Sequence, residues 1–178
     1  NNAMGFCFFA NASVAARHAL EAHGLERVAI IDFDVHHGNG TEDCCAGDDR
    51  ILMCSIFQHP FYPYSGADKP AANMCNVPLA AGCGGEEFRD AVTQVWMPRL
   101  KEFKPQLIII SAGFDGHYED DMGGLKLVEK DYAWCTEELK KVAAQFSEKR
   151  IVSMLEGGYV MTSLARSVGA HLRSLADL

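Results

Sequence analysis

Short, unbroken runs of apolar residues alternate along this chain with longer stretches of helical periodicity. The runs span residues 28–31, 51–55, 107–111 and 151–155, with a weaker one at 76–79. Strands that are buried on both faces of a parallel sheet have this continuous apolar character. Helices are predicted before, between and after these runs, over 12–23, 86–103 with a break at Pro98, 130–149 and 163–175. The alternation predicts an α/β fold with a mostly parallel sheet flanked by helices.

Composition narrows the class of protein. The chain has 178 residues, 48% of them apolar, which is enough for one core and predicts one domain or part of one. A net charge of −8 without a basic run argues against nucleic-acid binding, and no apolar run approaches the ~20 residues of a membrane helix. The seven cysteines include no C-x-x-C pair, which argues against a cysteine zinc site. They predict reduced, buried thiols in a cytoplasmic protein.

The first ten residues are unusually apolar for a chain terminus. The segment GFCFFA at 5–10 follows a start that is not a methionine, whereas a free terminus is usually polar and frayed. This predicts a chain cut out of a larger domain, with Phe8 and Phe9 in its core. A truncated sheet exposes a strand edge, and that favours self-association into a homo-oligomer.

Polar residues follow three of the predicted strands. Asp32, Asp34 and His36 come after the first strand, Asp115 follows 107–111, and the sequence EGGY at 156–159 follows 151–155. Ligands of open α/β sheets bind beyond the carboxyl ends of the strands. Residues two apart share a face of an extended chain, so we expect Asp32, Asp34 and His36 on one side and the intervening apolar residues on the other.

These residue types suit a metal. A carboxylate and an imidazole on one face, with Asp115 from a neighbouring strand end, would supply three protein ligands and leave one position open. Catalytic zinc has this arrangement. An Asp-x-His pair alone is weak evidence, since its alternative is a satisfied carboxylate and a core histidine. Three polar turns at one sheet edge favour the metal site.

Five motifs, in order, resemble the zinc-dependent histone deacetylase family, in its class II-like and bacterial acetoin-utilisation branch. They are GFCFF at 5–9, DFDVHHGNGT at 32–41, FYPYSG at 61–66, SAGFD at 111–115 and EGGY at 156–159. The resemblance runs along essentially the whole chain. It implies an arginase/deacetylase fold and zinc-dependent hydrolysis of N-acetyl amides, releasing acetate and a free amine.

The resemblance also implies roles for individual residues. Asp34, His36 and Asp115 match the zinc ligands, and Tyr159 matches the tyrosine whose hydroxyl polarises the acetyl carbonyl.

The acyl-lysine channel is assigned to three residues. Phe6 and Tyr62 match its two walls, and Gly157 belongs to the same channel. Tyr62 stands where the family usually has phenylalanine, which leaves the polarity of the channel open.

A second cation and a histidine pair are implied as well. Asp32, Asp34, His36 and Ser55 match a buried monovalent-cation site, commonly potassium. Asp32 and Asn39 match positions that orient a His-His pair, one member of which is the general base. That pair precedes the GFC segment in the family and is absent from this chain.

We therefore expect residues 1–178 to be a partial deacetylase-like catalytic domain, its C-terminal portion, without the first strands and without the base. The parent would be a metal-dependent deacetylase, and this chain alone would be inactive. The alternative is a non-catalytic remnant that keeps its metal. An arginase-like hydrolase is less favoured, because a two-metal site needs more aspartates around the histidine. Whether the substrate is acetyl-lysine in protein or an acetylpolyamine stays open.

The remaining polar residues receive plainer interpretations. His37 falls on the opposite face from His36 and is expected to be a structural, hydrogen-bonded histidine. His117 and the acidic run at 119–121 are expected in a solvated loop, and His59 is a lesser candidate for the entrance. Surface positions on helices are expected for the last three histidines, His18, His23 and His171.

Overall fold

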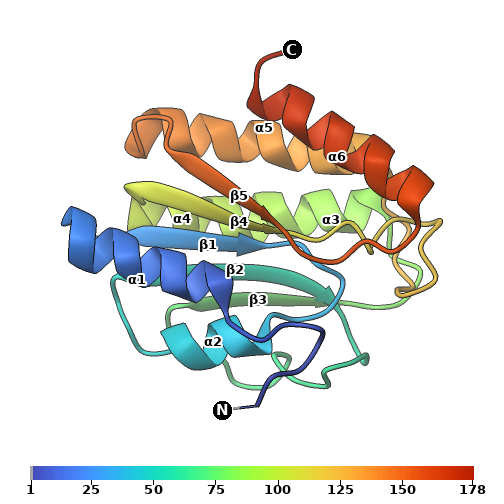
Figure 1. Cartoon of the computed structure of the whole chain (residues 1–178), viewed down its shortest axis with the longest axis horizontal. Helices are drawn as coiled ribbons and strands as arrows, with labels where there is room; N and C mark the ends of the chain where they lie inside the picture. The colour runs from blue at the N-terminus through green and yellow to red at the C-terminus, as the bar shows by residue number, and fades with distance from the viewer. Residues whose placement is uncertain (1) are drawn as a thin grey trace.

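The computed structural model describes residues 2–178 and confirms the α/β prediction. Five parallel strands form one sheet in the order β3-β2-β1-β4-β5, and they all run in the same direction in Figure 1. The strands are β1 (Val28–Asp32), β2 (Ile51–Gln58), β3 (Met74–Leu79), β4 (Leu107–Ala112) and β5 (Ile151–Leu155). The helices are α1 (Asn11–His23), α2 (Asn39–Cys45), α3 (Gly85–Ala91), the π-helical turn η1 (Val92–Trp96), α4 (Met97–Phe103), α5 (Glu129–Phe146) and α6 (Met161–Leu175).

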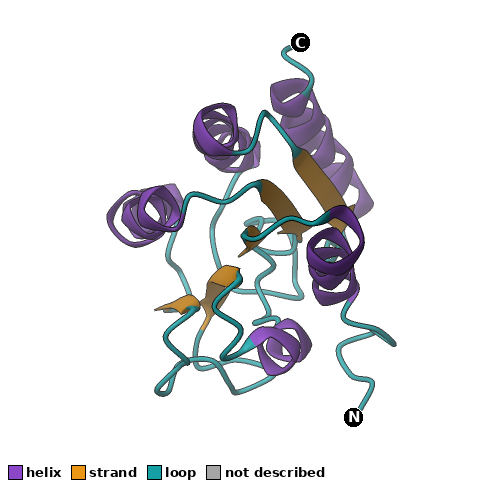
Figure 2. Ribbon diagram, turned by 90° about the vertical axis from the view of Figure 1, so that its left-hand side faces the viewer, coloured by secondary structure: helices purple, strands orange, loops and turns teal. Residues whose placement is uncertain are grey.

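Helices cover both faces of the sheet, as Figure 2 shows. On one face, small side chains of α1 such as Ala16 pack against Ile30 and Met53. On the other face, α3, η1, α4 and α5 supply a larger core that includes Trp96 and Leu139. Because both faces are covered, the residues of β1 and β2 are buried along their whole length. This explains why those strands have continuous apolar runs.

Two helical segments differ from the sequence prediction. The short helix α2 was not predicted, since its seven residues hold no apolar periodicity. The helix predicted over 86–103 is divided by η1, and Pro98 lies in the first turn of α4 just after it. Proline lacks an N–H and its ring clashes with the carbonyl four residues earlier, so the irregular turn lies where the regular ladder would fail.

The edge strand β5 and the N-terminal segment are exposed. Val152 and Leu155 of β5 are 46% and 62% exposed. Phe8 and Phe9, predicted to lie in the core, are 84% and 74% exposed, and that prediction is wrong. The segment that carries them lies at the periphery of the molecule (Figure 2), where no element within 2–178 covers it.

The cysteines are all free, but they are not all buried. Cys45, Cys54, Cys75 and Cys135 lie in the interior, in line with the prediction, and Cys83 is partly covered. The prediction is wrong for the remaining two, Cys7 and Cys44, which are exposed.

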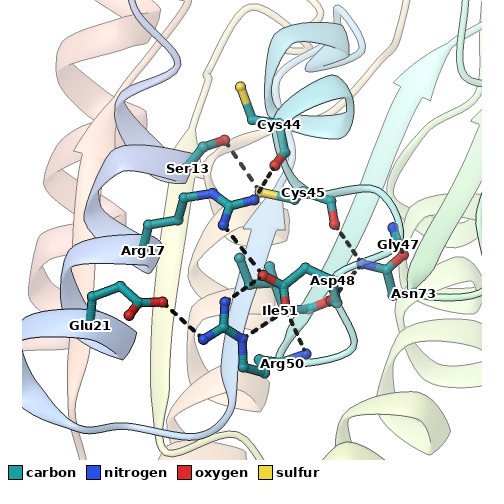
Figure 3. Close-up of polar contacts among 10 residues, drawn as sticks. All are labelled: Ser13, Arg17, Glu21, Cys44, Cys45, Gly47, Asp48, Arg50, Ile51 and Asn73. Carbon is teal, nitrogen blue, oxygen red and sulfur yellow. Dashed lines mark hydrogen bonds and ion pairs between the residues drawn. The ribbon is translucent and has the colours of Figure 1, made fainter.

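A polar network ties together the end of the sheet opposite the polar loops. Figure 3 shows Arg17 of α1 donating to the carbonyl of Cys44 and pairing with Asp48, which also receives Arg50. The amide of Asn73 donates to the carbonyls of Cys45, Asp48 and Ile51. The network fixes the turn before β2 against α1 and the loop before β3. It therefore supports the sheet at a distance from the candidate site.

Candidate metal centre

The loops after β1, β4 and β5 meet at one edge of the sheet, on the side to which the strands point in Figure 1. Strand register aligns their starting points, because Asp32 lies level with Ser111, and Ser111 lies level with Met154. The residues that follow these three strands therefore emerge side by side.

The chain after β1 folds into tight turns rather than continuing as a strand. Asp32 Oδ1 accepts the N–H of Asp34 at 3.1 Å, and Asp34 Oδ1 accepts the N–H of His36 at 2.8 Å. Such side-chain turns are typical of aspartate. Phe33 and Val35 still pack into the core, so the expected alternation of sides holds for them. Asp32 differs from the prediction: it is buried and lies outside the cluster that Asp34 and His36 form.

Three potential ligand atoms converge. His36 Nδ1 lies 3.1 Å from Asp34 Oδ1 and 3.1 Å from Asp115 Oδ2, and the three residues offer ligand atoms within 4.8 Å of one another. Zinc bonds of about 2.0–2.2 Å in tetrahedral geometry place two ligands about 3.3 Å apart. The nitrogen–oxygen distances and the donor types both fit a zinc ion.

Backbone groups hold the two carboxylates in place. Asp115 Oδ1 accepts the N–H of Val35 at 2.9 Å, and Asp34 Oδ2 accepts the N–H of Gly157 at 2.8 Å. A Cβ added at Gly157 would lie 2.1 Å from Asp115 Oδ2, so only glycine allows this approach. Gly157 was assigned to the substrate channel, and the structure places it directly against the carboxylates.

Negative charge accumulates at this edge. Burial, followed by the charge of Asp34, raises the pKa of Asp115 to about 6. Burial and Asp34 also raise the pKa of Asp32 well above its usual range. Burial lowers the pKa of His36, but hydrogen bonds and charges from Asp115 and Asp34 outweigh it and raise that pKa to about 10. The imidazole proton thus occupies the space between two carboxylates that a divalent cation would fill.

Tyr159 stands beside this cluster, two residues after Gly157. Its side chain is 39% exposed, and its ring centroid lies 6.1 Å from that of Phe6 in an edge-to-face arrangement. Burial, together with the charges of Asp115 and Asp34, raises the pKa of Tyr159 to about 12. The hydroxyl is therefore protonated at neutral pH and available as a hydrogen-bond donor.

Aromatic side chains surround His36. The ring of Phe61 stacks on the imidazole with centroids 5.4 Å apart, and Tyr62 meets it edge-on at 6.2 Å. Phe61 was not predicted, although its place beside Tyr62 in the FYPYSG motif was the available signal. Phe6 is 80% exposed. In the part of the chain that the structure describes, Phe6 and Tyr62, the two residues assigned to the channel walls, are both open to solvent.

His37 lies beneath the site in a buried network. Its Nε2 lies 2.7 Å from Glu42 Oε2 and its Nδ1 lies 3.1 Å from Ser55 Oγ, in agreement with a structural histidine. Since the carboxylate accepts from Nε2–H, Nδ1 accepts from the serine hydroxyl. Asn39, expected to orient a histidine, contacts the Met4 sulfur at 3.2 Å. The monovalent-cation site at Asp32 and Ser55 stays a prediction.

Two histidines expected at the surface are buried, and those predictions are wrong. His117 is fully buried, and its Nδ1 accepts the N–H of Glu119 at 3.1 Å. His171 is 2% exposed, and it bridges Thr136 of α5 and Ser153 of β5. The periodicity of α6 did not show which of its faces meets α5 and the sheet.

Comparisons with known proteins all find relatives of one family. The family described as "Histone deacetylase domain" matches residues 1–175. The chain is 40% identical to a type-2 histone deacetylase 2 of Dictyostelium discoideum, over 97% of this chain and 11% of that protein. It is 39% identical to a histone deacetylase-like amidohydrolase of Pseudomonas aeruginosa, over 89% of this chain and 44% of that protein.

A solved structure is similarly close. The crystal structure of the HDA15 HD domain superposes with a TM-score of 0.91 at 34% identity, covering 99% of this chain and 52% of the other. The chain therefore spans about half or less of each of these proteins. Among residues 2–178, no helix is long and apolar enough to cross a membrane.

Proposed function

This chain belongs to the histone deacetylase family, and from that premise we propose that it supplies the zinc-binding part of an enzyme that hydrolyses N-acetylated amines. The observation that carries the proposal is the convergence of Asp34, His36 and Asp115 at the strand ends. Gly157 lies so close to Asp115 that a side chain at position 157 would collide with the carboxylate, and this close approach supports the arrangement.

Each residue near the cluster has a defined task in this proposal. Asp34, His36 and Asp115 hold the zinc, which when bound polarises an amide carbonyl and lowers the pKa of a water molecule. The hydroxyl of Tyr159 stays protonated and donates a hydrogen bond to the oxygen on which negative charge develops. A donor of this kind contributes about 10²–10³ in rate. Phe61 stacks on the imidazole of His36 and Tyr62 meets it edge-on, and these contacts orient the ring.

Three of the histidines are already engaged in hydrogen bonds or buried. His36 is engaged with both carboxylates, His37 with Ser55 and Glu42, and His117 is buried. We therefore propose that turnover needs a base from the part of the domain that relatives carry outside the matched region. Metal binding without turnover is the second function that these observations favour for this chain on its own.

The substrate class follows from the charge at the site. Carboxylates at 32, 34, 115 and 156 gather at this edge, and Glu156 has a pKa raised by burial. Such a field favours a substrate that keeps positive charge beside its acetylated nitrogen, as an acetylpolyamine does and as an acetylated lysine with basic neighbours would. An acetylated lysine or polyamine fits, and a potassium ion and a cytoplasmic location belong to the same proposal. The exposed edge of β5 suits self-association.

The test is turnover of an acetyl-lysine peptide and of an acetylpolyamine by the longest form of the protein that the gene encodes, with zinc added. Tyr159→Phe should lower kcat about 10²–10³-fold with little change in KM, since its hydroxyl acts mainly in the transition state. Tyr118→Phe, at a tyrosine that is 58% exposed, is the matched control and should keep full activity. Equal activity of the Tyr159 variant and the wild type would refute the assignment.

A further inference from the structure

Asp120 is a buried carboxylate that the proposed reaction does not use. It is 4% exposed although it lies in an acidic run expected to be solvated, and no cationic side chain among residues 2–178 pairs with it. Its Oδ2 accepts the N–H of Tyr159 at 2.7 Å and the N–H of Val160 at 3.2 Å. Its Oδ1 accepts the N–H of Met122 at 3.0 Å. Three backbone donors therefore satisfy this carboxylate.

We propose that Asp120 is a positioning residue that holds the backbone of Tyr159 so that its hydroxyl faces the metal cluster. The inference rests on the proposed function of Tyr159 and adds a residue to it.

The loop that carries Tyr159 needs such an anchor. Gly158 has a φ of +134°, a conformation that side-chain-bearing residues rarely adopt, and two successive glycines give the segment little conformational preference of its own. Helix α6 begins just after the loop, and no side chain at its N-cap residue, Val160, bonds to it. Asp120, from a distant segment, instead binds the two N–H groups that directly precede the helix, and its negative charge also suits the N-terminus of a helix.

The same loop connects the tyrosine to a proposed metal ligand. Asp115 and Asp120 are five residues apart, and between them the N–H of Asp120 donates to the carbonyl of His117 at 2.9 Å. The N–H of Phe114 donates to the carbonyl of Gly157 at 2.8 Å, so the loops after β4 and β5 are joined at two points. Figure 1 shows both loops at the carboxyl edge of the sheet. The loop after β4, which carries the proposed metal ligand Asp115, therefore helps to determine the position of Tyr159.

A second contact holds α6 to the same loop. Arg166 of α6 donates to Glu119 Oε1 at 2.7 Å and also pairs with Glu129. These groups are exposed, and exposed pairs contribute little on their own. The buried Asp120 is therefore expected to contribute most to holding the loop.

The substitution Asp120→Asn keeps the size of the side chain but weakens the hydrogen bonds by which it holds the loop. Whichever way the amide turns, its NH₂ group faces either the N–H of Met122 or the N–H groups of Tyr159 and Val160, and one set of donors loses its acceptor. A displacement of about 1 Å in a reacting group costs about 10²-fold in rate. We expect kcat to fall about 10- to 100-fold, with KM changed less than about threefold and zinc content unchanged.

Two measurements test the proposal on the longest encoded form of the protein. The first is amide hydrogen exchange over residues 157–163, which should accelerate about tenfold in Asp120→Asn and stay unchanged in Asp121→Asn. Asp121 is the exposed neighbour in the same run and serves as the matched control. Unchanged exchange in Asp120→Asn overturns the proposal whether or not the protein is an active deacetylase. If Asp120→Asn does not fold, the same exchange measurement is made on Asp120→Ser, which keeps one oxygen acceptor.

The second measurement is a double-mutant cycle with Tyr159→Phe. If Asp120 acts through the tyrosine hydroxyl, Asp120→Asn should lower kcat by less than about twofold in the Tyr159→Phe background. An equal loss of kcat in both backgrounds shows a merely structural role and overturns the proposal. If the wild type has no activity, the proposed function fails, and the exchange measurement alone decides whether Asp120 holds the loop.

Discussion

Acid should destabilise this protein through His171, which fastens α6 to the rest of the fold. Thr136 Oγ1 donates to the carbonyl of Tyr132 at 2.7 Å, so it accepts from His171 Nδ1–H at 2.7 Å. The other nitrogen, Nε2, accepts from the Ser153 hydroxyl at 2.9 Å. The imidazole also packs on Phe33, with centroids 6.1 Å apart. Both ring nitrogens are therefore satisfied while His171 is neutral, and burial disfavours a charge on the ring.

The size of the effect follows from the pKa. Burial lowers the pKa of His171 from 6.5 to about 4. Above about pH 6.5 neither the folded nor the unfolded state binds the proton, and the free energy of unfolding does not depend on this group. As pH falls below that value the unfolded state binds the proton first, so stability decreases until pH reaches about 4. The full difference is about 3 kcal/mol, and about 2 kcal/mol of it is lost between about pH 7.5 and about pH 5.

Urea unfolding at those two pH values measures the effect. His171→Gln cannot titrate, so its stability should decrease by about 2 kcal/mol less than that of the wild type over this interval, although the variant is less stable at neutral pH. His18→Gln, at an exposed histidine of α1, is the matched control and should keep the wild-type pH dependence. If wild type and His171→Gln lose equal stability between the two pH values, the buried neutral imidazole is the wrong explanation.

Three further predictions concern the metal centre and the activity. Asp34→Ala and His36→Ala should each remove zinc from the purified protein, as measured by elemental analysis, and full occupancy in both would contradict the ligand assignment. Gly157→Ala should also lose zinc, because its Cβ would lie 2.1 Å from Asp115 Oδ2; Gly169→Ala in α6 is the control that should keep the metal. Residues 1–178 alone should hydrolyse a fluorogenic acetyl-lysine substrate about 10²–10⁴-fold more slowly than a longer protein that contains the His-His pair, and comparable rates would show that a base lies within this chain.

Local pattern was sufficient for much of the fold. Five strands and most helices were predictable, because continuous apolar runs reflect burial on both faces of the sheet and helical spacing reflects burial on one. The alternation of Phe33 and Val35 with Asp34 and His36 separated the core side of the loop from the polar side. Parallel strands end at one edge, so Asp34, His36 and Asp115 could be expected together before the structure placed them there.

Contacts between distant residues were beyond the reach of that reasoning. Asp120 and His117 look like loop residues in the sequence, but both are buried, Asp120 against the loop after β5 and His117 beside Leu127. The sequence determined which side chains could bind a metal or donate a proton. The tertiary structure decided which of them are buried, which backbone groups hold them and where Tyr159 stands, because those properties depend on how α6 and the loops pack together.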